Sequence, residues 1–308
     1  MLGRMGRRDR VAWTARIGCM ALAACLGIGI ADAQQPGPTK SEGSYLGSRL
    51  MPTQPHGTCP PHVDPMYSAY AVVTGTDMRQ RPWGFAIALR EVLVKASGDP
   101  RLVGEPRVAE LAEHADRYVA CFSYLDLMAD TPLHDEQGTY DRPHKLTVVF
   151  APEKIDALLA EFGDKPWRGT RPVVVPILLV HGRKPPAYVL SAETPGQQDQ
   201  RWAIGVSADT YGVKARIPSE AELAEWGVSV DRFPYPGAPA PAGKAADEAV
   251  VAGTLDWSET QPGWIGRWRC RCPGGDHRWG IDGVNYDAAF RDIMRGVVVL
   301  AAGRGSPD

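Results

Sequence analysis

The stretch that decides the fold is Trp264-Ile265-Gly266-Arg267-Trp268-Arg269-Cys270-Arg271-Cys272, in which two kinds of residue alternate strictly. Successive side chains of a β-strand point to opposite faces. This order therefore puts tryptophan, glycine and cysteine on one face and isoleucine and arginine on the other. The pattern is typical of an antiparallel strand with one face on a core and the other in solvent. We predict an antiparallel sheet in this half of the chain.

Two neighbouring strands and a helix complete this unit. Strands are expected over 249–257 and 278–281, with turns rich in proline and glycine on either side of 264–272. An amphipathic helix is expected over 286–302, because apolar residues recur there at helical spacing. Residues 183–303 are therefore predicted to form a C-terminal α+β subdomain that ends in an antiparallel β-meander and a C-terminal helix.

The first half of the chain alternates strands and helices. Strands are expected over 67–74, 121–124, 145–150 and 172–180, and the helices between them begin near Pro82, Pro106 and Pro152. The segment 172–180 is almost continuously apolar, as expected where both faces of a strand are covered. Residues 66–182 are predicted to form an N-terminal α/β subdomain. The fold class is therefore α+β, with two small mixed α/β subdomains.

The first 33 residues have the features of a secretion signal. Arginines precede an uncharged apolar run over 17–30, and Ala31-Asp32-Ala33 supplies the small residues that a signal peptidase needs. The run is shorter than the roughly 20 apolar residues that span a bilayer. We predict that residues 1–33 are a signal peptide and that the protein is periplasmic or secreted. A lipid anchor on Cys25 is the alternative, which we disfavour because apolar residues follow that cysteine.

Composition limits the classes of function. Hydrophobic residues make up 44% and charged residues 23% of the chain, which is typical of a globular protein. The formal net charge is −2 and becomes more negative without the arginine-rich leader, so we expect no nucleic-acid partner. No transmembrane segment is expected after the leader. Residues 34–65 are predicted to be a flexible Pro/Gly-rich tail, and residues 304–308 a disordered end.

Four of the six cysteines remain after the leader: Cys59, Cys121, Cys270 and Cys272. An even number in an exported protein permits disulfides, and all three possible pairings stay open. Cys270 and Cys272 with His277 are candidate ligands for a soft metal, which thiolates and imidazole bind. Zinc sites space their cysteines more widely and need a fourth ligand. We therefore expect neither a metal nor another cofactor.

The outer face of the alternating strand carries Arg267, Arg269 and Arg271, which are candidates for anion binding because guanidinium groups pair well with phosphate and carboxylate. We favour the alternative of an ordinary solvated sheet face. The sequence has no nucleophile elbow, no His-Glu-x-x-His, no phosphate-binding glycine loop and no dinucleotide fingerprint. No catalytic residue is therefore predicted.

Several groups of core and turn residues occur in a recognisable order. In the first half they are 88–94 with Ser97-Gly98-Asp99, Tyr118-Val119 with Phe122-Ser123-Tyr124, Val148-Val149-Phe150 with 155–159, and Trp167 with Arg171-Pro172. In the second half they are Tyr211-Gly212-Val213, Ile217-Pro218, Gly253-Thr254-Leu255 and Trp264-x-Gly266-x-Trp268. Together they resemble the domain of unknown function 2066 family of exported bacterial proteins, over about residues 66–302. The resemblance implies export to the envelope and an unassigned, non-enzymatic role, with no family catalytic residues to transfer.

These observations favour an exported, non-catalytic binding or scaffold module for another envelope component. Its partner is expected to be an unidentified envelope protein or a small ligand. Two alternatives stay open. One is an enzyme whose site is assembled from dispersed residues between the subdomains, where clefts tend to form. The other is a thiol or metal-binding protein that uses Cys270, Cys272 and His277.

Overall fold

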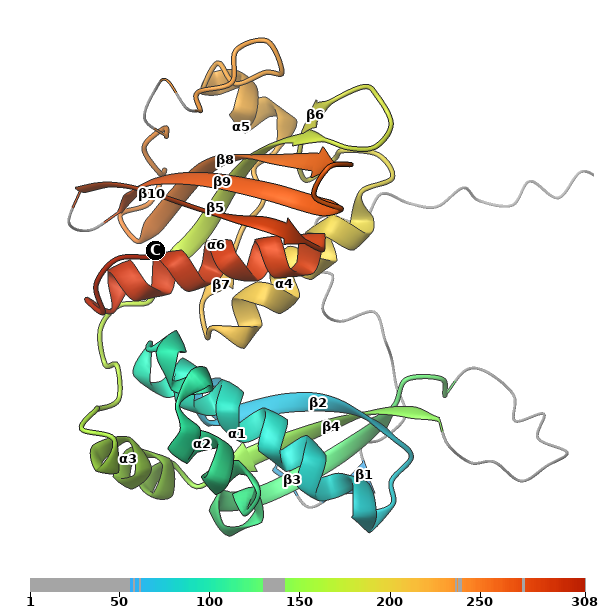
Figure 1. Cartoon of the computed structure of the whole chain (residues 1–308), viewed down its shortest axis with the longest axis vertical. Helices are drawn as coiled ribbons and strands as arrows, with labels where there is room; N and C mark the ends of the chain where they lie inside the picture. Colours follow the sequence, from blue (N-terminus) through green and yellow to red (C-terminus); the bar gives the residue numbers. More distant parts are fainter. Residues whose placement is uncertain are drawn as a thin grey trace, which may run out of the picture. The chain divides into compact units, whose positions relative to one another are not determined.

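The computed structural model describes residues 56–57, 59–60, 62–129, 142–235, 237, 240–272 and 275–307. The predicted signal peptide over 1–33, with Cys25, and most of the predicted tail over 34–65 lie outside the described residues. The described chain combines helices with one antiparallel sheet and one mixed sheet, so the predicted α+β class is confirmed (Figure 1). No helix in the described part is both long and apolar enough to cross a bilayer.

The first sheet has the strand order β1-β3-β4-β2, and all its pairs are antiparallel. Its strands are β1 (His56–Gly57), β2 (Ser68–Thr74), β3 (Val119–Asp126) and β4 (Pro143–Phe150). Buried and more exposed residues alternate along β2, because one face of the sheet contacts helices. The predicted strands over 67–74 and 145–150 match β2 and β4 closely.

Helices cover one face of this sheet. They are α1 (Arg81–Ser97), α2 (Pro106–Ala112) and α3 (Pro152–Glu161), with short 3-10 turns η1 (Pro65–Tyr67), η2 (Met78–Gln80), η3 (Pro100–Gly104) and η4 (Ala115–Tyr118). Leu89 and Leu93 of α1 are fully buried against Leu146 and Val148 of β4. Helix α1 ends where Gly98 adopts φ 70°, a left-handed conformation that favours glycine. The predicted helix stop is therefore confirmed.

The end of the predicted flexible tail is attached to the first sheet. His56 and Gly57 pair with Tyr124 and Ser123 of β3, and Cys59 forms a disulfide with Cys121 of the same strand. The structure differs from the expectation at these positions because the covalent bond and the strand pairing both hold the chain. Similarly, the predicted disordered end makes contacts, since Arg304 forms an ion pair with Asp164 at 2.6 Å.

The second sheet has the order β10-β9-β8-β5-β6, with the short β7 also paired to β5. Its strands are β5 (Val173–His181), β6 (Tyr188–Val189), β7 (Lys214–Ala215), β8 (Glu248–Ser258), β9 (Gly263–Cys272) and β10 (Gly275–Val284). Strands β8, β9 and β10 form the predicted antiparallel meander. Strand β5 runs parallel to β8 and β7, whereas its pairing with β6 is antiparallel.

The position of β5 corrects one expectation. We placed the strand over 172–180 in the N-terminal subdomain, but it pairs with strands of the second half. Its two faces contact different cores: Val174 and Leu178 lie in the larger one, and Val175 and Ile177 lie in a smaller one with Leu223. A strand covered on both faces needs layers on both sides, and the second sheet provides them.

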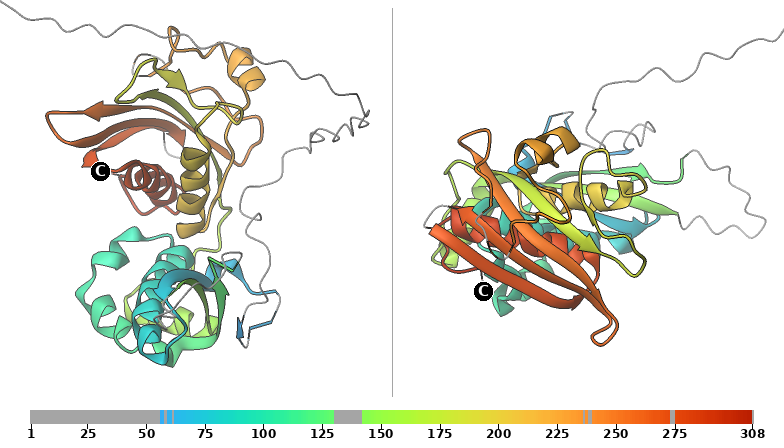
Figure 2. Two further views of the ribbon diagram at one scale, coloured as in Figure 1. Left: turned by 90° about the vertical axis from the view of Figure 1, so that its right-hand side faces the viewer. Right: turned by 90° about the horizontal axis from the view of Figure 1, so that it is seen from above.

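Two helices lie on one face of the second sheet and one on the other. Helices α4 (Gln198–Thr210) and α6 (Tyr286–Ala301) contact each other, and α6 packs against β9 and β10. The short helix α5 (Glu220–Glu225) covers the opposite face through Leu223. The left view of Figure 2 shows α6 almost end-on beside α4, beneath the sheet. The predicted C-terminal helix after the meander is thus confirmed.

Candidate functional site

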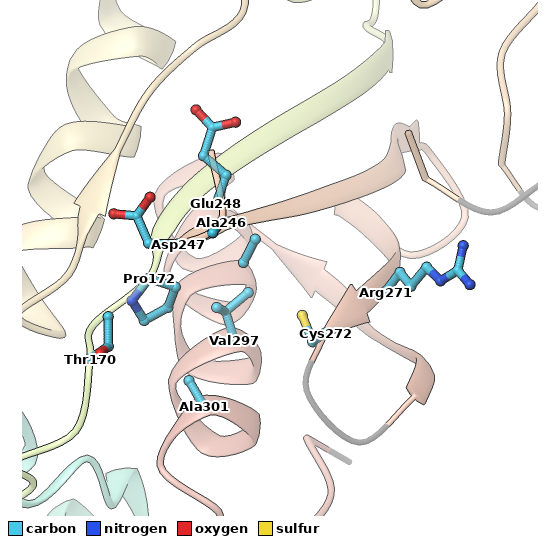
Figure 3. Close-up of a pocket in the computed structure, with 10 residues that line it drawn as sticks. Thr170, Pro172, Ala246, Asp247, Glu248, Arg271, Cys272, Val297 and Ala301 are labelled. Atoms are coloured by element: carbon cyan, nitrogen blue, oxygen red, sulfur yellow. The ribbon is translucent and has the colours of Figure 1, made fainter. Parts of the chain in front are cut away.

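A pocket of about 170 Å³ lies where several elements of the second half begin or end. Strands β5 and β8 run parallel and start here, and β9 is antiparallel to β8 and ends here. The last turn of α6 closes the pocket from the helix side (Figure 3). The residues that line it are Thr170, Pro172, Ala246, Asp247, Glu248, Ala249, Arg271, Cys272, Val297 and Ala301.

The pocket has an apolar floor and a charged rim. Pro172, Val297 and Ala301 supply apolar surface, whereas Asp247 and Arg271 are exposed at the rim. Among the described residues, neither of these two side chains has an ion-pair partner. Figure 3 shows the Arg271 side chain extending away from α6. The guanidinium of Arg271 therefore lies on the face of β9 opposite Cys272, at the outer edge of the rim.

The carboxylate of Glu248 is already engaged. Arg216 contacts it at 2.8 Å, and the backbone N–H of Lys244 also donates to the Glu248 carboxylate. The same arginine contacts Glu222 at 2.7 Å. Burial raises the pKa of Glu248, but these hydrogen bonds outweigh it, so the pKa lies below its ordinary value. Glu248 is held ionised, and its role is to fix the start of β8 next to α5.

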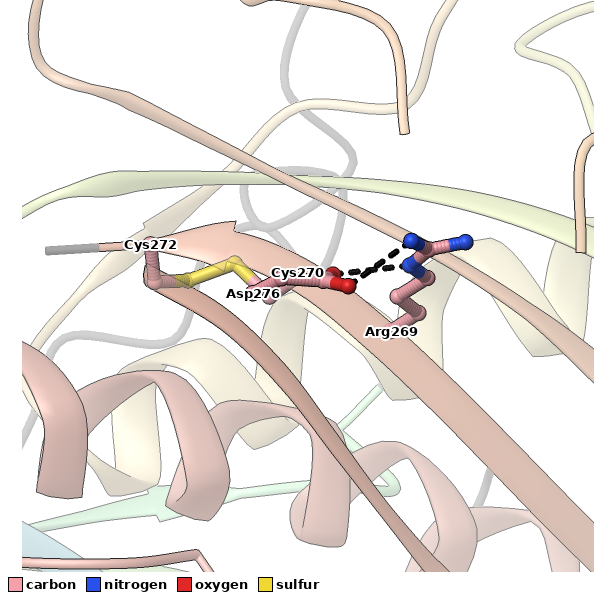
Figure 4. Close-up of a disulfide and its surroundings, with 4 residues drawn as sticks. All are labelled: Arg269, Cys270, Cys272 and Asp276. Carbon is pink, nitrogen blue, oxygen red and sulfur yellow. Dashed lines mark hydrogen bonds and ion pairs between the residues drawn. A yellow bond between two sulfur atoms is a disulfide. The ribbon is translucent and has the colours of Figure 1, made fainter. Parts of the chain in front are cut away.

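The disulfide Cys270–Cys272 lies within β9 beside this pocket (Figure 4). The two cysteines are separated by a single residue, and both point to the α6 side of the sheet, where they belong to the larger core. Cys270 is fully buried, and Cys272 is 7% exposed and lines the pocket. Of the pairings left open by the sequence, the structure has Cys59 with Cys121 and Cys270 with Cys272.

His277 lies next to the disulfide on the neighbouring strand. It pairs directly with Cys270 in the register of β9 and β10, so both side chains are on the same face of the sheet. Its Nε2 atom is buried, and no described residue hydrogen-bonds to it. The structure therefore places His277 beside Cys270 and bonds Cys270 to Cys272, which accounts for all three residues that the sequence suggested as metal ligands. In the disulfide form neither sulfur is a thiolate, the form that binds a metal.

Two of the three arginines on the outer face of β9, Arg267 and Arg269, have acidic partners. Arg269 forms a two-pronged hydrogen bond with Asp276, with both distances at 2.7 Å, as Figure 4 shows. Arg267 pairs with Asp282 at 2.7 Å. Only Arg271 of the three reaches the pocket rim. The outer face does not present three unpaired guanidinium groups, because β10 supplies an acidic partner for two of them.

A histidine–carboxylate pair lies near the opposite end of β5 and β8. His181 and Asp256 are cross-strand neighbours, and Nδ1 of the histidine is 2.6 Å from Oδ1 of the aspartate. Both side chains are nearly half exposed. No described hydroxyl or thiol is hydrogen-bonded to this histidine, so the pair lacks the nucleophile that such a dyad activates in hydrolases. The alternative of an enzyme with dispersed residues stays a prediction.

Sequence reasoning missed most of this pocket. Glu248 and Arg216 are separated in the chain and meet only because β5 pairs in parallel with both β7 and β8. No local motif marks either residue. Among the described residues, no group of three or more histidine, cysteine and carboxylate side chains is arranged to hold a metal ion.

The comparisons with known proteins concern the first half of the chain. Residues 62–168 match the model of a domain of unknown function, DUF8605, which covers about a third of the sequence. This is an uncharacterised domain, as expected, but it is not domain of unknown function 2066, the family that we named from the sequence patterns. The chain has no significant match to a curated protein and none to a solved structure. The matched residues contain strands β2, β3 and β4 of the first sheet, and the pocket and the Cys270–Cys272 disulfide lie outside them.

Proposed function

We propose that this protein is an exported binding module of the cell envelope and that it recognises a segment of a partner protein at the pocket beside Arg271. The observation that carries the proposal is an apolar floor whose rim carries a carboxylate, Asp247, and a cation, Arg271, neither of which has an ion-pair partner among the described residues. Binding sites commonly join apolar surface to a few polar groups that fix orientation. Asp247 and Arg271 supply such groups here.

The size of the pocket limits what it holds. Pockets for cofactors and drug-sized ligands measure roughly 300–1,000 Å³. At about 170 Å³ this pocket suits one or two side chains of a docked segment better than a complete small-molecule cofactor. A partner segment with an apolar side chain flanked by charged residues fits the floor and the rim together. This chemistry favours a protein partner over a free small ligand.

Export is supported by the cysteines. Both disulfides belong to the part of the chain that follows the arginine-rich leader, and stable disulfides form in oxidising compartments such as the periplasm. Fractionation of cells that produce the full chain tests this part. Recovery of a shortened chain outside the cytoplasm is expected, and recovery of the full-length, reduced chain in the cytoplasm would contradict it.

Partner recognition is tested by photocrosslinking from a defined position in cells. A photoreactive amino acid replaces Arg271 at the rim, and a matched control carries it at Glu153, an exposed position on α3. We expect one discrete adduct from position 271 that is missing from position 153. The same background of adducts from both positions would overturn the assignment of the pocket as the recognition site.

A further inference from the structure

The Cys270–Cys272 disulfide does not join separate elements of the structure. Both cysteines belong to β9, and their sequence separation is 2. The ladder already fixes them, because Cys270 pairs with Val251 of β8 on one side and with His277 of β10 on the other. A bond that closes so short a loop restricts the unfolded chain little. The bond between Cys59 and Cys121, by contrast, attaches β1 and its flanking chain to β3.

We propose that the Cys270–Cys272 disulfide is a thiol-reactive site that accepts two electrons from small thiols entering the pocket beside Arg271. The two sulfur atoms have different access. Cys272 lines the pocket, whereas Cys270 is fully buried. Thiol–disulfide exchange requires a thiolate to approach one sulfur directly. The geometry therefore assigns Cys272 as the sulfur that is attacked and Cys270 as the leaving group.

His277 is placed to assist the leaving sulfur. Its side chain is the cross-strand neighbour of Cys270, on the same face, and its buried Nε2 has no described hydrogen-bond partner. A thiolate formed at Cys270 would be buried in an apolar core, where a negative charge is costly. A proton or a hydrogen bond from the imidazole removes that cost. This gives the unpartnered nitrogen a chemical role that the oxidised structure alone does not show.

The reaction balances as two exchanges. In the first, a thiolate forms a bond to Cys272 Sγ, the Cys270–Cys272 bond breaks, and Cys270 leaves with the electron pair and takes a proton from the imidazolium form of His277, which is left neutral and regains a proton from water. In the second, another thiolate attacks the sulfur of the incoming group, and Cys272 leaves as a thiolate that takes a proton from water. The protein disulfide is reduced to two thiols, and two small thiols are oxidised to one disulfide.

This inference goes beyond partner binding and needs no partner protein. It uses the proposed export only because an oxidising compartment is where the disulfide is formed. Its test uses purified chain, so its outcome is independent of the crosslinking and fractionation experiments. A negative result for thiol exchange would not contradict partner binding, and the reverse also holds.

The first measurement compares the two disulfides within one molecule. The oxidised protein is treated with reduced glutathione, quenched with acid and alkylated, and the free cysteines are identified by mass spectrometry over time. Cys59 and Cys121 are both partly exposed, so exposure alone predicts that their bond is reduced first. The proposal predicts the opposite order, with Cys270 and Cys272 alkylated at least tenfold faster. Reduction of Cys59–Cys121 first would overturn it.

Variants test which sulfur reacts and what His277 does. With oxidised glutathione, Cys270→Ser is expected to form a mixed disulfide at Cys272, whereas Cys272→Ser is expected to leave Cys270 unmodified. Equal modification of both variants contradicts the assigned roles. His277→Gln is expected to slow reduction of Cys270–Cys272 by about a hundredfold, a typical loss for a general acid, and to leave Cys59–Cys121 unchanged. Equal slowing at both disulfides, or none, would show that His277 has no part in the exchange.

Discussion

Trp268 of β9 donates a hydrogen bond from its indole Nε1 to Oδ2 of Asp292 in α6, at 3.0 Å. Both residues are buried, and Arg295 contacts the other carboxylate oxygen at 2.7 Å. Burial raises the pKa of Asp292, although the hydrogen bonds from Arg295 and Trp268 act against that rise. The contact fixes α6 on the meander, and α6 in turn forms one wall of the pocket beside Arg271.

The Trp268–Asp292 hydrogen bond predicts a large effect of removing the indole nitrogen. Trp268→Phe leaves a buried carboxylate oxygen without its donor and opens a small space, so we expect a loss of about 3 kcal/mol in unfolding free energy. The matched control is Trp257→Phe, because Trp257 donates to the exposed carboxylate of Glu259 at 2.7 Å. That variant should lose less than about 1 kcal/mol. Urea unfolding measures both, and equal losses would contradict the role of burial.

The indole of Trp268 also lies against Gly266 of the same strand, and this contact predicts the effect of adding a methyl group at Gly266. A Cβ on Gly266 would fall within the ring of Trp268, and the fully buried ring has no free space into which to move. Gly266→Ala is therefore expected to lower the unfolding free energy by about 2 kcal/mol. Gly205→Ala in α4 is the control, since a Cβ there meets nothing within 4 Å and alanine favours a helix. Thermal melts measure both variants, and Gly205→Ala should be neutral or stabilising by up to about 1 kcal/mol.

Removing Arg216 is expected to leave two carboxylates without their shared cation. Arg216 contacts Glu222 and Glu248, whose side chains are 7% and 8% exposed. Nearly buried carboxylates that lose their main cation are destabilising, and because Lys244 stays 3.7 Å from Glu222 and solvent reaches the arginine we expect Arg216→Gln to cost about 2–3 kcal/mol. Calorimetry measures the change. Arg183→Gln, which removes an exposed cation that contacts Glu259 at 3.8 Å, should cost less than about 1 kcal/mol.

The ion pairs of Arg216 with Glu222 and Glu248 also predict how the destabilisation by Arg216→Gln depends on pH. The hydrogen bond from Arg216 holds the pKa of Glu222 below its ordinary value of 4.5, against the effect of burial. The unfolded chain therefore takes up this proton at a higher pH than the folded chain does. The stabilisation is complete above pH 4.5 and is lost as the pH falls through the lowered value. The difference in unfolding free energy between wild type and Arg216→Gln should be largest near pH 7 and shrink as the pH falls toward and below 4.5, in urea titrations at each pH, because the carboxylates of the variant take up protons more readily.

Local features were predictable from sequence, and pairings between distant segments were not. The alternation over 264–272 correctly placed Trp268 and Cys270 on the core face, because side-chain direction in a strand is a local property. Gly98 likewise marked the end of α1. The strand over 172–180 was assigned to the wrong half, because its apolar composition reports burial but not the identity of its partner strands. The pocket depends on those same strand pairings, so no local sequence motif marks Asp247 as one of its residues.

The two disulfides are expected to contribute very differently to stability. Cys59–Cys121 closes a long loop, with a sequence separation of 62, so the double variant Cys59→Ala with Cys121→Ala should lose about 4 kcal/mol by the loop-entropy relation. Cys270–Cys272 closes a minimal loop, with a sequence separation of 2, and its double alanine variant should lose only about 1 kcal/mol from that term. Alanine avoids placing a hydroxyl in the buried position of Cys270. Urea unfolding of both variants under oxidising conditions gives the ranking. The reverse order would mean that the Cys270–Cys272 bond stabilises the core directly, which would weaken the case that it is retained for its reactivity.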